Sequence, residues 1–247
     1  MPTRVKKHTS LWVAVCSLAL SSAAHAAIDL GATRVIFNSE DKSASLSIKN
    51  SATQPYVVQT WIEDRPDLSA LGSAHARLMV VPPLLRLDPG KETALRIVRS
   101  KGALPQDKET VFWLDVHEIP PKPTQPNVLQ LALRSRIKIF YRPVKLAGTL
   151  DSAFGALNWQ VVAGADGTKL LRVHNPSAYH VTFSKISALV KAGQSVELDL
   201  KDSMVAPGTD LDIALPRGQA SVNSVSASYI NDFGGASDIK PFTIVSP

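Results

Sequence analysis

Cysteine is almost absent from this sequence. The single cysteine, Cys16, lies in an apolar stretch near the amino terminus, so the rest of the chain cannot form an internal disulfide. The chain also lacks a dense Lys/Arg run interleaved with aromatic residues, which argues against a nucleic-acid partner. Beyond the amino-terminal stretch no apolar run approaches the roughly 20 residues of a transmembrane helix. We therefore expect no integral membrane segment, and a fold stabilised by core burial alone.

Signatures of an enzyme are missing as well. There is no nucleophile elbow, phosphate-cradling glycine loop or zinc-binding HExxH motif. Asp210 and Asp212 lack the rest of a calcium loop. The histidines are scattered without metal-ligand spacing; beyond the amino-terminal stretch they are His75, His117, His174 and His180. The sequence thus predicts a non-enzymatic protein with no catalytic residue, no metal and no cofactor.

The amino-terminal stretch has the three parts of a secretory signal peptide. Three basic residues precede an apolar segment over 11–20, and Ala24-His25-Ala26 forms a small-x-small cleavage signal. We expect residues 1–26 to be a leader cleaved after Ala26, which predicts an exported protein. Removing its three basic residues lowers the formal net charge from +6 to +3, which is mild.

The remaining sequence is typical of an all-β fold. Segments rich in Val, Ile, Leu, Thr and Tyr are separated by turn residues such as Asp88-Pro89-Gly90 and Ala206-Pro207-Gly208. Polar and apolar residues alternate over 45–49 and 196–200, as in half-buried strands. About 220 residues suffice for two domains of roughly 110. Immunoglobulin-like sandwiches fit this pattern, although the Cys…Trp…Cys signature is absent.

We place the domain boundary after Arg142-Pro143. These residues end the longest strand candidate, and the pattern over 145–154 is irregular. The expected domains are 27–143 and 144–247. Strand candidates of the second domain are 157–162, 168–174, 179–190, 196–199, 211–215, 222–230 and 239–245.

Several motifs resemble the PapD-like family of periplasmic pilus chaperones. They lie in both expected domains, so the resemblance covers the architecture of the whole exported chain and implies two sandwiches in an L-shape with a cleft between them. The motifs are TRVIF at 33–37, PPLLRLDPG at 82–90, the strand at 112–121, the segment from Asn127 to Pro143, and YINDFGG at 229–235.

The resemblance implies a chaperone that lends a β-strand to pilus subunits. Such a subunit is a sandwich lacking its last strand, and its open groove is an aggregation hazard until it is paired. The family's donor strand corresponds to the segment beginning at Asn127, which implies that Leu129, Leu131 and Leu133 fill the groove, whereas Ile137 and Ile139 serve the chaperone's own core. Pattern alone favours an ordinary inner face for this whole row.

Arg34 and Lys138 match the two basic residues that hold the subunit's C-terminal carboxylate in this family. Two cations converging on one carboxylate form strong charge-assisted bonds where water is excluded. Taken singly, each would be a solvated strand charge. Strict alternation gives Lys138 the parity of Arg134 and Arg136, opposite to the leucines, and a bulge near Ser135 would reconcile the two sets.

Glu109, Arg142 and Asp232 match the family's inter-domain salt bridges; without the resemblance they would be ordinary surface pairs worth about 0 to 1 kcal/mol each. The short connection over 118–127 and the lack of cysteine resemble the subclass that assembles rod-like pili.

The expected partners are pilus subunits and an outer-membrane usher in the periplasm, with a self-capping homodimer left open. The alternative is a structural one, a fibre subunit or adhesin that is itself assembled. The long strand candidate and the cysteine-free exported chain argue against that alternative.

Overall fold

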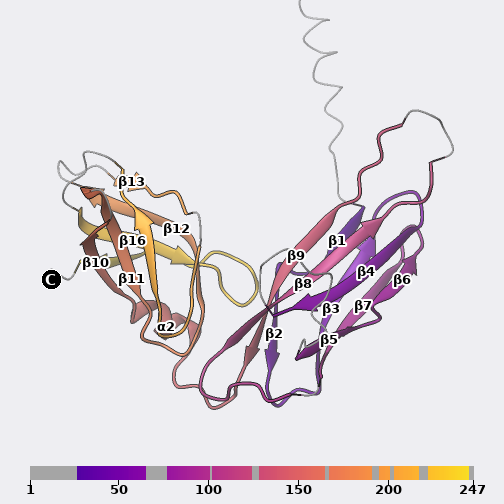
Figure 1. The fold of residues 1–247 in the computed structure, drawn as a ribbon, viewed down its shortest axis with the longest axis horizontal. Coiled ribbons are helices and arrows are strands. Elements are labelled where there is room, and N and C mark those ends of the chain that lie inside the picture. Colours follow the sequence, from indigo (N-terminus) through magenta and orange to yellow (C-terminus); the bar gives the residue numbers. More distant parts are fainter. Residues whose placement is uncertain are drawn as a thin grey trace, which may run out of the picture.

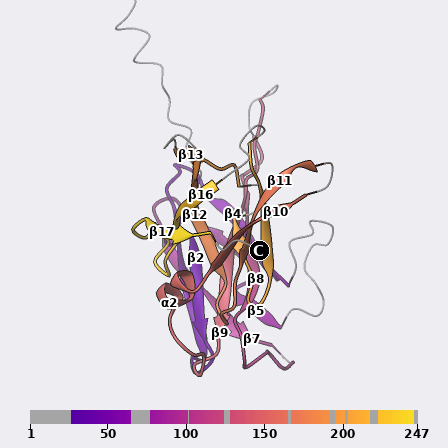
Figure 2. The ribbon, with the colours of Figure 1, turned by 90° about the vertical axis from the view of Figure 1, so that its left-hand side faces the viewer.

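We describe the protein from a computed structural model over residues 27–64, 77–100, 102–123, 128–164, 167–190, 195–200, 203–216 and 222–244. The predicted leader with Cys16, and also His75 and Asn127, lie outside these ranges. Figure 1 shows two β-rich lobes set at an angle, and Figure 2 shows them edge-on. The prediction of an all-β fold with two sandwich domains is confirmed.

The first domain packs two sheets face to face. One sheet has the strand order β1-β3-β7-β5 and the other the order β2-β9-β8-β4-β6. The strands of the first sheet are β1 (Ile28–Leu30), β3 (Ser43–Asn50), β7 (Glu92–Arg99) and β5 (Leu78–Val81). Those of the second are β2 (Arg34–Asn38), β9 (Arg134–Arg142), β8 (Thr110–Ile119), β4 (Tyr56–Glu63) and β6 (Leu84–Leu87).

Alternating residues of both sheets form the core of the first domain. In β3 the apolar members of the alternation, Leu46 and Ile48, are buried, whereas Lys49 is exposed. Phe112 and Ile139 of the other sheet are fully buried in the same cluster. Burial of such side chains contributes roughly 1.5–3 kcal/mol each, which supports a fold without a disulfide.

The second domain is also a sandwich. Its sheets have the orders β10-β11-β15 and β13-β12-β16-β17, and β14 pairs with β12. The first sheet comprises β10 (Asn158–Ala163), β11 (Lys169–His174) and β15 (Asp210–Ala214). The second comprises β13 (Ser195–Glu197), β12 (Val181–Val190), β16 (Val222–Tyr229), β17 (Lys240–Thr243) and β14 (Met204–Val205).

A short helix, α2 (Leu150–Gly155), lies in the segment where the sequence showed no regular pattern. Thr149 caps it, because its side chain accepts a hydrogen bond from the backbone N–H of Ser152, whose hydroxyl reaches back to Thr149. Phe154 is buried against Tyr229, with 4.7 Å between the ring centroids. The helix is too short for a 3.6-residue periodicity to show, so sequence reasoning missed it.

Candidate partner-binding site

Strand β9 is paired unequally on its two edges. Toward β8 it is paired from Arg134 to Tyr141, whereas toward β2 the pairing covers only the end of the strand, from Lys138 to Arg142. Among the described residues, no strand therefore lies beside the β2-side edge of β9 between Arg134 and Ile137. An open edge of this kind presents unpaired backbone N–H and C=O groups to any chain able to add a strand.

The three predicted leucines lie just before β9 and project into solvent. Leu129 is 88% exposed, Leu131 is 68% exposed and Leu133 is 45% exposed. By contrast, Ile137 and Ile139 belong to the first domain's core, at 8% and 0% exposure. The row that alternates in the sequence thus divides into an outward apolar part and an inward part.

The segment over 128–133 is not a strand in the structure, which corrects the expectation that the long strand candidate begins at Asn127. Its attachments include a hydrogen bond from the backbone N–H of Glu118 to the carbonyl of Leu133 at 2.8 Å and one from the Gln130 amide to the carbonyl of Pro121 at 2.6 Å. Regular strand geometry begins at Arg134, where pairing with His117 of β8 starts.

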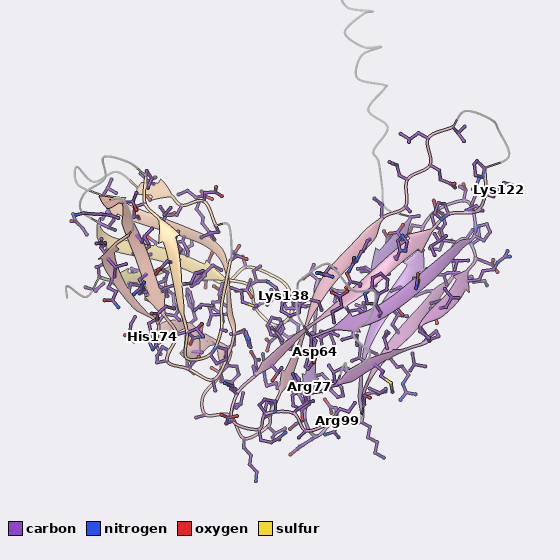
Figure 3. All side chains as sticks on the ribbon, in the orientation of Figure 1. Asp64, Arg77, Arg99, Lys122, Lys138 and His174 are labelled. Atoms are coloured by element: carbon purple, nitrogen blue, oxygen red, sulfur yellow. The ribbon has the colours of Figure 1, made fainter. Side chains whose placement is uncertain are left out.

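Arg34 and Lys138 lie side by side, because β2 and β9 are parallel and these two residues are register partners. Neighbouring residues in a sheet project from the same face. Figure 3 shows Lys138 where the two domains meet. The structure thus brings the two predicted cations together at the end of the open edge of β9.

Arg34 is an unusually buried cation. It is 8% exposed, donates from Nη1 to the carbonyl of Ile230 at 2.9 Å, and lies 5.5 Å from the ring centroid of Phe140. Its Nε is buried, with no hydrogen-bond partner in the described part of the chain. Loss of solvent lowers the pKa of Arg34, although the charges of Asp232 and Glu109 oppose this. A desolvated guanidinium with a spare donor is suited to binding an anion.

The sequence left open whether a bulge near Ser135 brings Lys138 into line with the leucines, and the structure has none there, because the β8–β9 register continues without a shift from Arg134 to Tyr141. Lys138 therefore remains on the face opposite Ile137 and Ile139. The conflict with the leucines disappears for another reason. Two-residue alternation holds only within a strand, and the leucines precede the strand, so their direction does not fix that of Lys138.

Glu109, Arg142 and Asp232 form one network across the domain junction. Arg142 donates from Nε to Glu109 at 2.6 Å, and from Nη1 and Nη2 to the two Asp232 oxygens at 2.6 and 2.8 Å. Glu109 also accepts the backbone N–H of His180 at 2.8 Å. Burial by itself would lower the pKa of Arg142, but hydrogen bonding to Asp232 and the charge of Glu109 raise it overall. Glu109 is buried, so this is not ordinary surface pairing.

Sequence reasoning missed a second charged network on the outer face of the same sheet. Arg134 and Arg136 both bind the fully buried Asp115, at 2.7 and 2.9 Å, and both reach Glu63, at 3.2 and 2.6 Å. Trp61 donates to Glu63 and lies under the Arg134 guanidinium. The network holds the first residues of β9 on the side away from its open edge. The available signal was one carboxylate at the end of β4 and one among the apolar residues of β8, Glu63 and Asp115.

The 229–235 motif forms a loop that contacts the first domain. Asn231 closes the loop, because its side-chain oxygen accepts the backbone N–H groups of Phe233 and Gly235 at 3.0 Å each. Gly234 has φ +86° and lies against the Thr33 hydroxyl, leaving no room for a Cβ. Phe233 is exposed. The close approach of Gly234 places this loop beside the start of β2.

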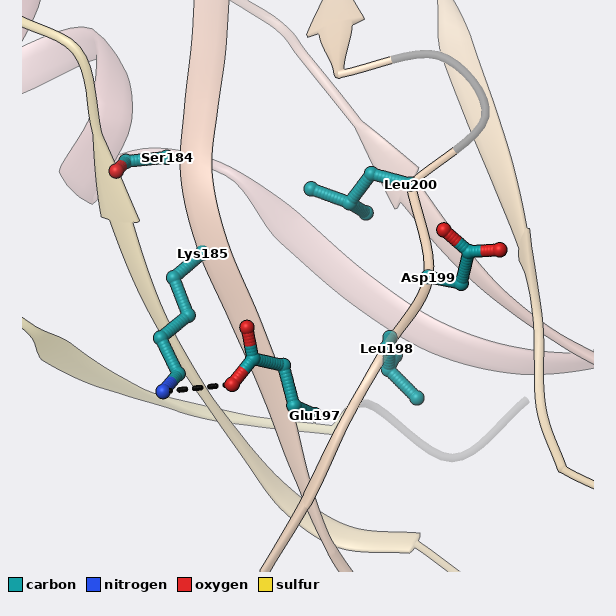
Figure 4. A pocket seen from close by; sticks show the side chains of 6 residues that line it. All are labelled: Ser184, Lys185, Glu197, Leu198, Asp199 and Leu200. Carbon is teal, nitrogen blue, oxygen red and sulfur yellow. Dashed lines mark ion pairs between the residues drawn. The ribbon is translucent and has the colours of Figure 1, made fainter. Parts of the chain in front are cut away.

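No group of three or more potential metal ligands occurs among the described residues. His174 pairs with Asp210 at 2.7 Å (Figure 3 shows its position in the second domain). The pocket in Figure 4 lies between β12 and the β13 region, where Lys185 pairs with Glu197 at 2.8 Å. Its charged lining carries no buried unpaired polar atom. In the part of the chain that the structure describes, no helix is long and apolar enough to cross a membrane.

Comparisons with known proteins point to the same family for both domains. Residues 27–147 match the family model "Pili and flagellar-assembly chaperone, PapD N-terminal domain", and residues 152–240 match "Pili assembly chaperone PapD, C-terminal domain". The chain is 38% identical over 216 residues to the chaperone protein LpfB of Salmonella typhimurium, covering 86% of this chain and 87% of the relative. It is 33% identical over 227 residues to the chaperone protein PapD of Escherichia coli, covering 90% and 89%.

Solved structures show the same likeness. The YadV chaperone superposes with a TM-score of 0.73 at 32% identity, covering 88% of this chain and 100% of that one. The SafB chaperone of Salmonella enterica, solved in complex with the SafA pilin, gives a TM-score of 0.74 at 27% identity, covering 90% and 99%.

Proposed function

This chain belongs to the PapD family of pilus-assembly chaperones, and on that premise we propose that it captures pilus subunits by donating the edge of β9. The observation that carries the proposal is the combination of an open edge of β9, three outward leucines just before it, and Lys138 of β9 paired in register with Arg34 of β2. The role of a fibre subunit is not favoured, because the matched family consists of chaperones.

The cations fix the direction in which the subunit strand binds. Its terminal carboxylate lies at Arg34 and Lys138, and its preceding residues run back past Leu133 toward Leu129. A strand with its carboxyl end at Lys138 runs in the same direction as β9, so the added pairing is parallel. The added strand lies on the same side of β9 as β2, beside the residues of β9 that β2 does not reach. It ends where β2 begins, at Arg34.

Anchoring the carboxylate also fixes the register. A slip by one residue would turn every side chain of the added strand to the opposite face. With the last subunit residue held, the apolar groove of the subunit receives the three leucines in one alignment. The capped subunit cannot pair with another copy of itself, because its open edge is occupied.

We place this activity in the periplasm, after removal of the predicted leader, and we propose delivery of the capped subunit to an outer-membrane usher. Release follows when the next subunit's amino-terminal extension replaces β9, so the energy comes from the better fit of the final strand. The free chaperone is able to cover its own apolar edge by pairing with a second copy. The inter-domain network of Arg142 holds the two domains at the angle that this site requires.

The double reversal Arg34→Glu with Lys138→Glu tests the anchor. We expect it to abolish recovery of a co-expressed pilin from periplasmic extracts, because the carboxylate would meet two negative charges. Lys49→Glu with Lys91→Glu is the matched control, since both residues are exposed on the other sheet and its turn. Unchanged pilin recovery with a folded double variant would refute the anchor.

A peptide experiment distinguishes the contribution of the terminal carboxylate to binding from that of strand pairing with β9. A synthetic peptide copying the carboxyl terminus of that pilin is titrated onto the chaperone as the free acid and as the terminal amide. We expect the amide to bind at least tenfold more weakly to the native protein. The difference should vanish in the Arg34→Glu, Lys138→Glu variant. Equal binding of acid and amide to the native protein would contradict the assignment of the two cations.

A further inference from the structure

A buried carboxylate at the end of β8 forms no ion pair with any cation in the described ranges. Glu118 is 2% exposed, and its Oε2 accepts the backbone N–H groups of Ala27 at 3.1 Å and Ile28 at 3.3 Å. Its Oε1 is buried and accepts no hydrogen bond within the described part of the chain. Burial raises the pKa of Glu118, and the two backbone N–H groups offset this only in part. A buried carboxylate served only by neutral donors is costly.

The nearer donor, the nitrogen of Ala27, is also the atom that leader removal would change. The predicted cleavage hydrolyses the peptide bond between Ala26 and Ala27. The C–N bond breaks, the oxygen of a water molecule joins the carbonyl carbon of Ala26, and the nitrogen of Ala27 takes up protons. An α-amino group has a pKa of about 7.7–8.0, so this atom becomes an ammonium group with three donors at neutral pH.

We propose that leader removal completes the first domain by creating a buried ion pair between the α-ammonium group of Ala27 and the carboxylate of Glu118. The proposal rests on the predicted cleavage site and is independent of subunit capture. Before cleavage, the partners of the carboxylate within the described part of the chain are the neutral backbone N–H groups of Ala27 and Ile28. After cleavage a positive charge lies at hydrogen-bond distance from a carboxylate that is 2% exposed, where a charge-assisted bond is strong.

The ion pair would connect three parts of the domain. Ala27 accepts the backbone N–H of Ser51 at 2.9 Å, and Ile28 is buried and paired with Asn50 of β3. Glu118 belongs to the opposite sheet, so the pair joins the two layers of the sandwich. The backbone N–H of Glu118 in turn holds the carbonyl of Leu133. The pair therefore supports the segment that carries the outward leucines.

A set of four proteins tests the pair. The first begins at Ala27, and the second carries a Gly-Ser-Gly extension that moves the ammonium group away; the other two repeat these with Glu118→Gln. We expect the extension to lower Tm by roughly 5 °C when Glu118 is present, and to leave Tm unchanged in the Glu118→Gln background. Glu92→Gln, at an exposed carboxylate of β7, is the matched control and should keep the full effect of the extension.

Two further measurements would show a charge effect that mere packing would not produce. The α-amine of Ala27 in the unextended protein should titrate at least one pH unit above its usual value, and Glu118→Gln should restore the usual value. Mass spectrometry of the exported protein should find Ala27 as the first residue. The proposal is overturned by a different first residue, by an ordinary titration of the α-amine, or by equal effects of the extension with and without Glu118.

Discussion

The exposed leucines allow subunit binding to be separated from folding, residue by residue. A Leu→Ala change removes about three carbon groups, each contributing about 0.8 kcal/mol when fully buried. Only the exposed share remains to be buried by a partner, and it amounts to 88%, 68% and 45% for Leu129, Leu131 and Leu133. We therefore expect losses of subunit binding free energy of about 2, 1.6 and 1 kcal/mol in that order. These correspond to roughly 30-fold, 15-fold and 5-fold weaker binding.

The assay is a titration of the purified chaperone variants with a pilin whose own donor extension has been deleted, alongside thermal unfolding of each variant alone. Because most of the Leu129 side chain is already in solvent, Leu129→Ala should hardly change Tm, whereas Leu133→Ala, at a side chain that is 45% exposed, should lower the unfolding free energy by about 1 kcal/mol. Ile139→Ala is the contrasting variant: its side chain is fully buried, so it should cost about 2–5 kcal/mol of unfolding free energy. A loss of stability for Leu129→Ala as large as that for Ile139→Ala, or subunit binding that does not respond to the leucine variants, would refute the division of the row into outward and inward parts.

Three other outcomes follow from the charged groups. Arg142→Ala should cost about 3–5 kcal/mol of unfolding free energy, because it removes the cation that is hydrogen-bonded to the buried Glu109, whereas Asp232→Asn, at a more exposed carboxylate, should cost much less in the same urea titration. Asp115→Ala should weaken the hydrogen bonding of the first residues of β9, because Arg134 and Arg136 lose their shared partner. Amide hydrogen exchange there should become faster, and unchanged exchange would contradict this. In the chain with an amino-terminal extension, the raised pKa of Glu118 means that the folded state binds a proton more tightly, so stability should fall as pH rises from the ordinary value of 4.5 through the folded value; Glu118→Gln should remove this slope.

Short-range patterns were sufficient for the fold class. Alternation over 45–49 reflects a strand with one face on the core, and turn residues such as Asp88-Pro89-Gly90 separate the strands as expected. The family resemblance then supplied Arg34, Lys138 and the three leucines. Pattern alone did not distinguish the outward leucines from Ile137 and Ile139, because all five occur at the same parity along the chain.

The networks were harder to infer from the sequence. Arg134 and Arg136 are far from Glu63 in the chain, and only the pairing of β4, β8 and β9 brings them within hydrogen-bond distance. The contact between Ala27 and Glu118 likewise crosses from one sheet to the other. Helix α2 escaped prediction because a helix of one or two turns leaves no periodic signal.

By itself the sequence determined an all-β fold without an internal disulfide, because composition, turn residues and two-residue alternation act over a few neighbouring positions. Only the tertiary structure shows which edge of β9 is unpaired, that Arg34 and Lys138 adjoin that edge, and that the Glu118 carboxylate contacts the nitrogen of Ala27. Those features depend on strand order and register, which join residues far apart in the chain, and no local pattern encodes them.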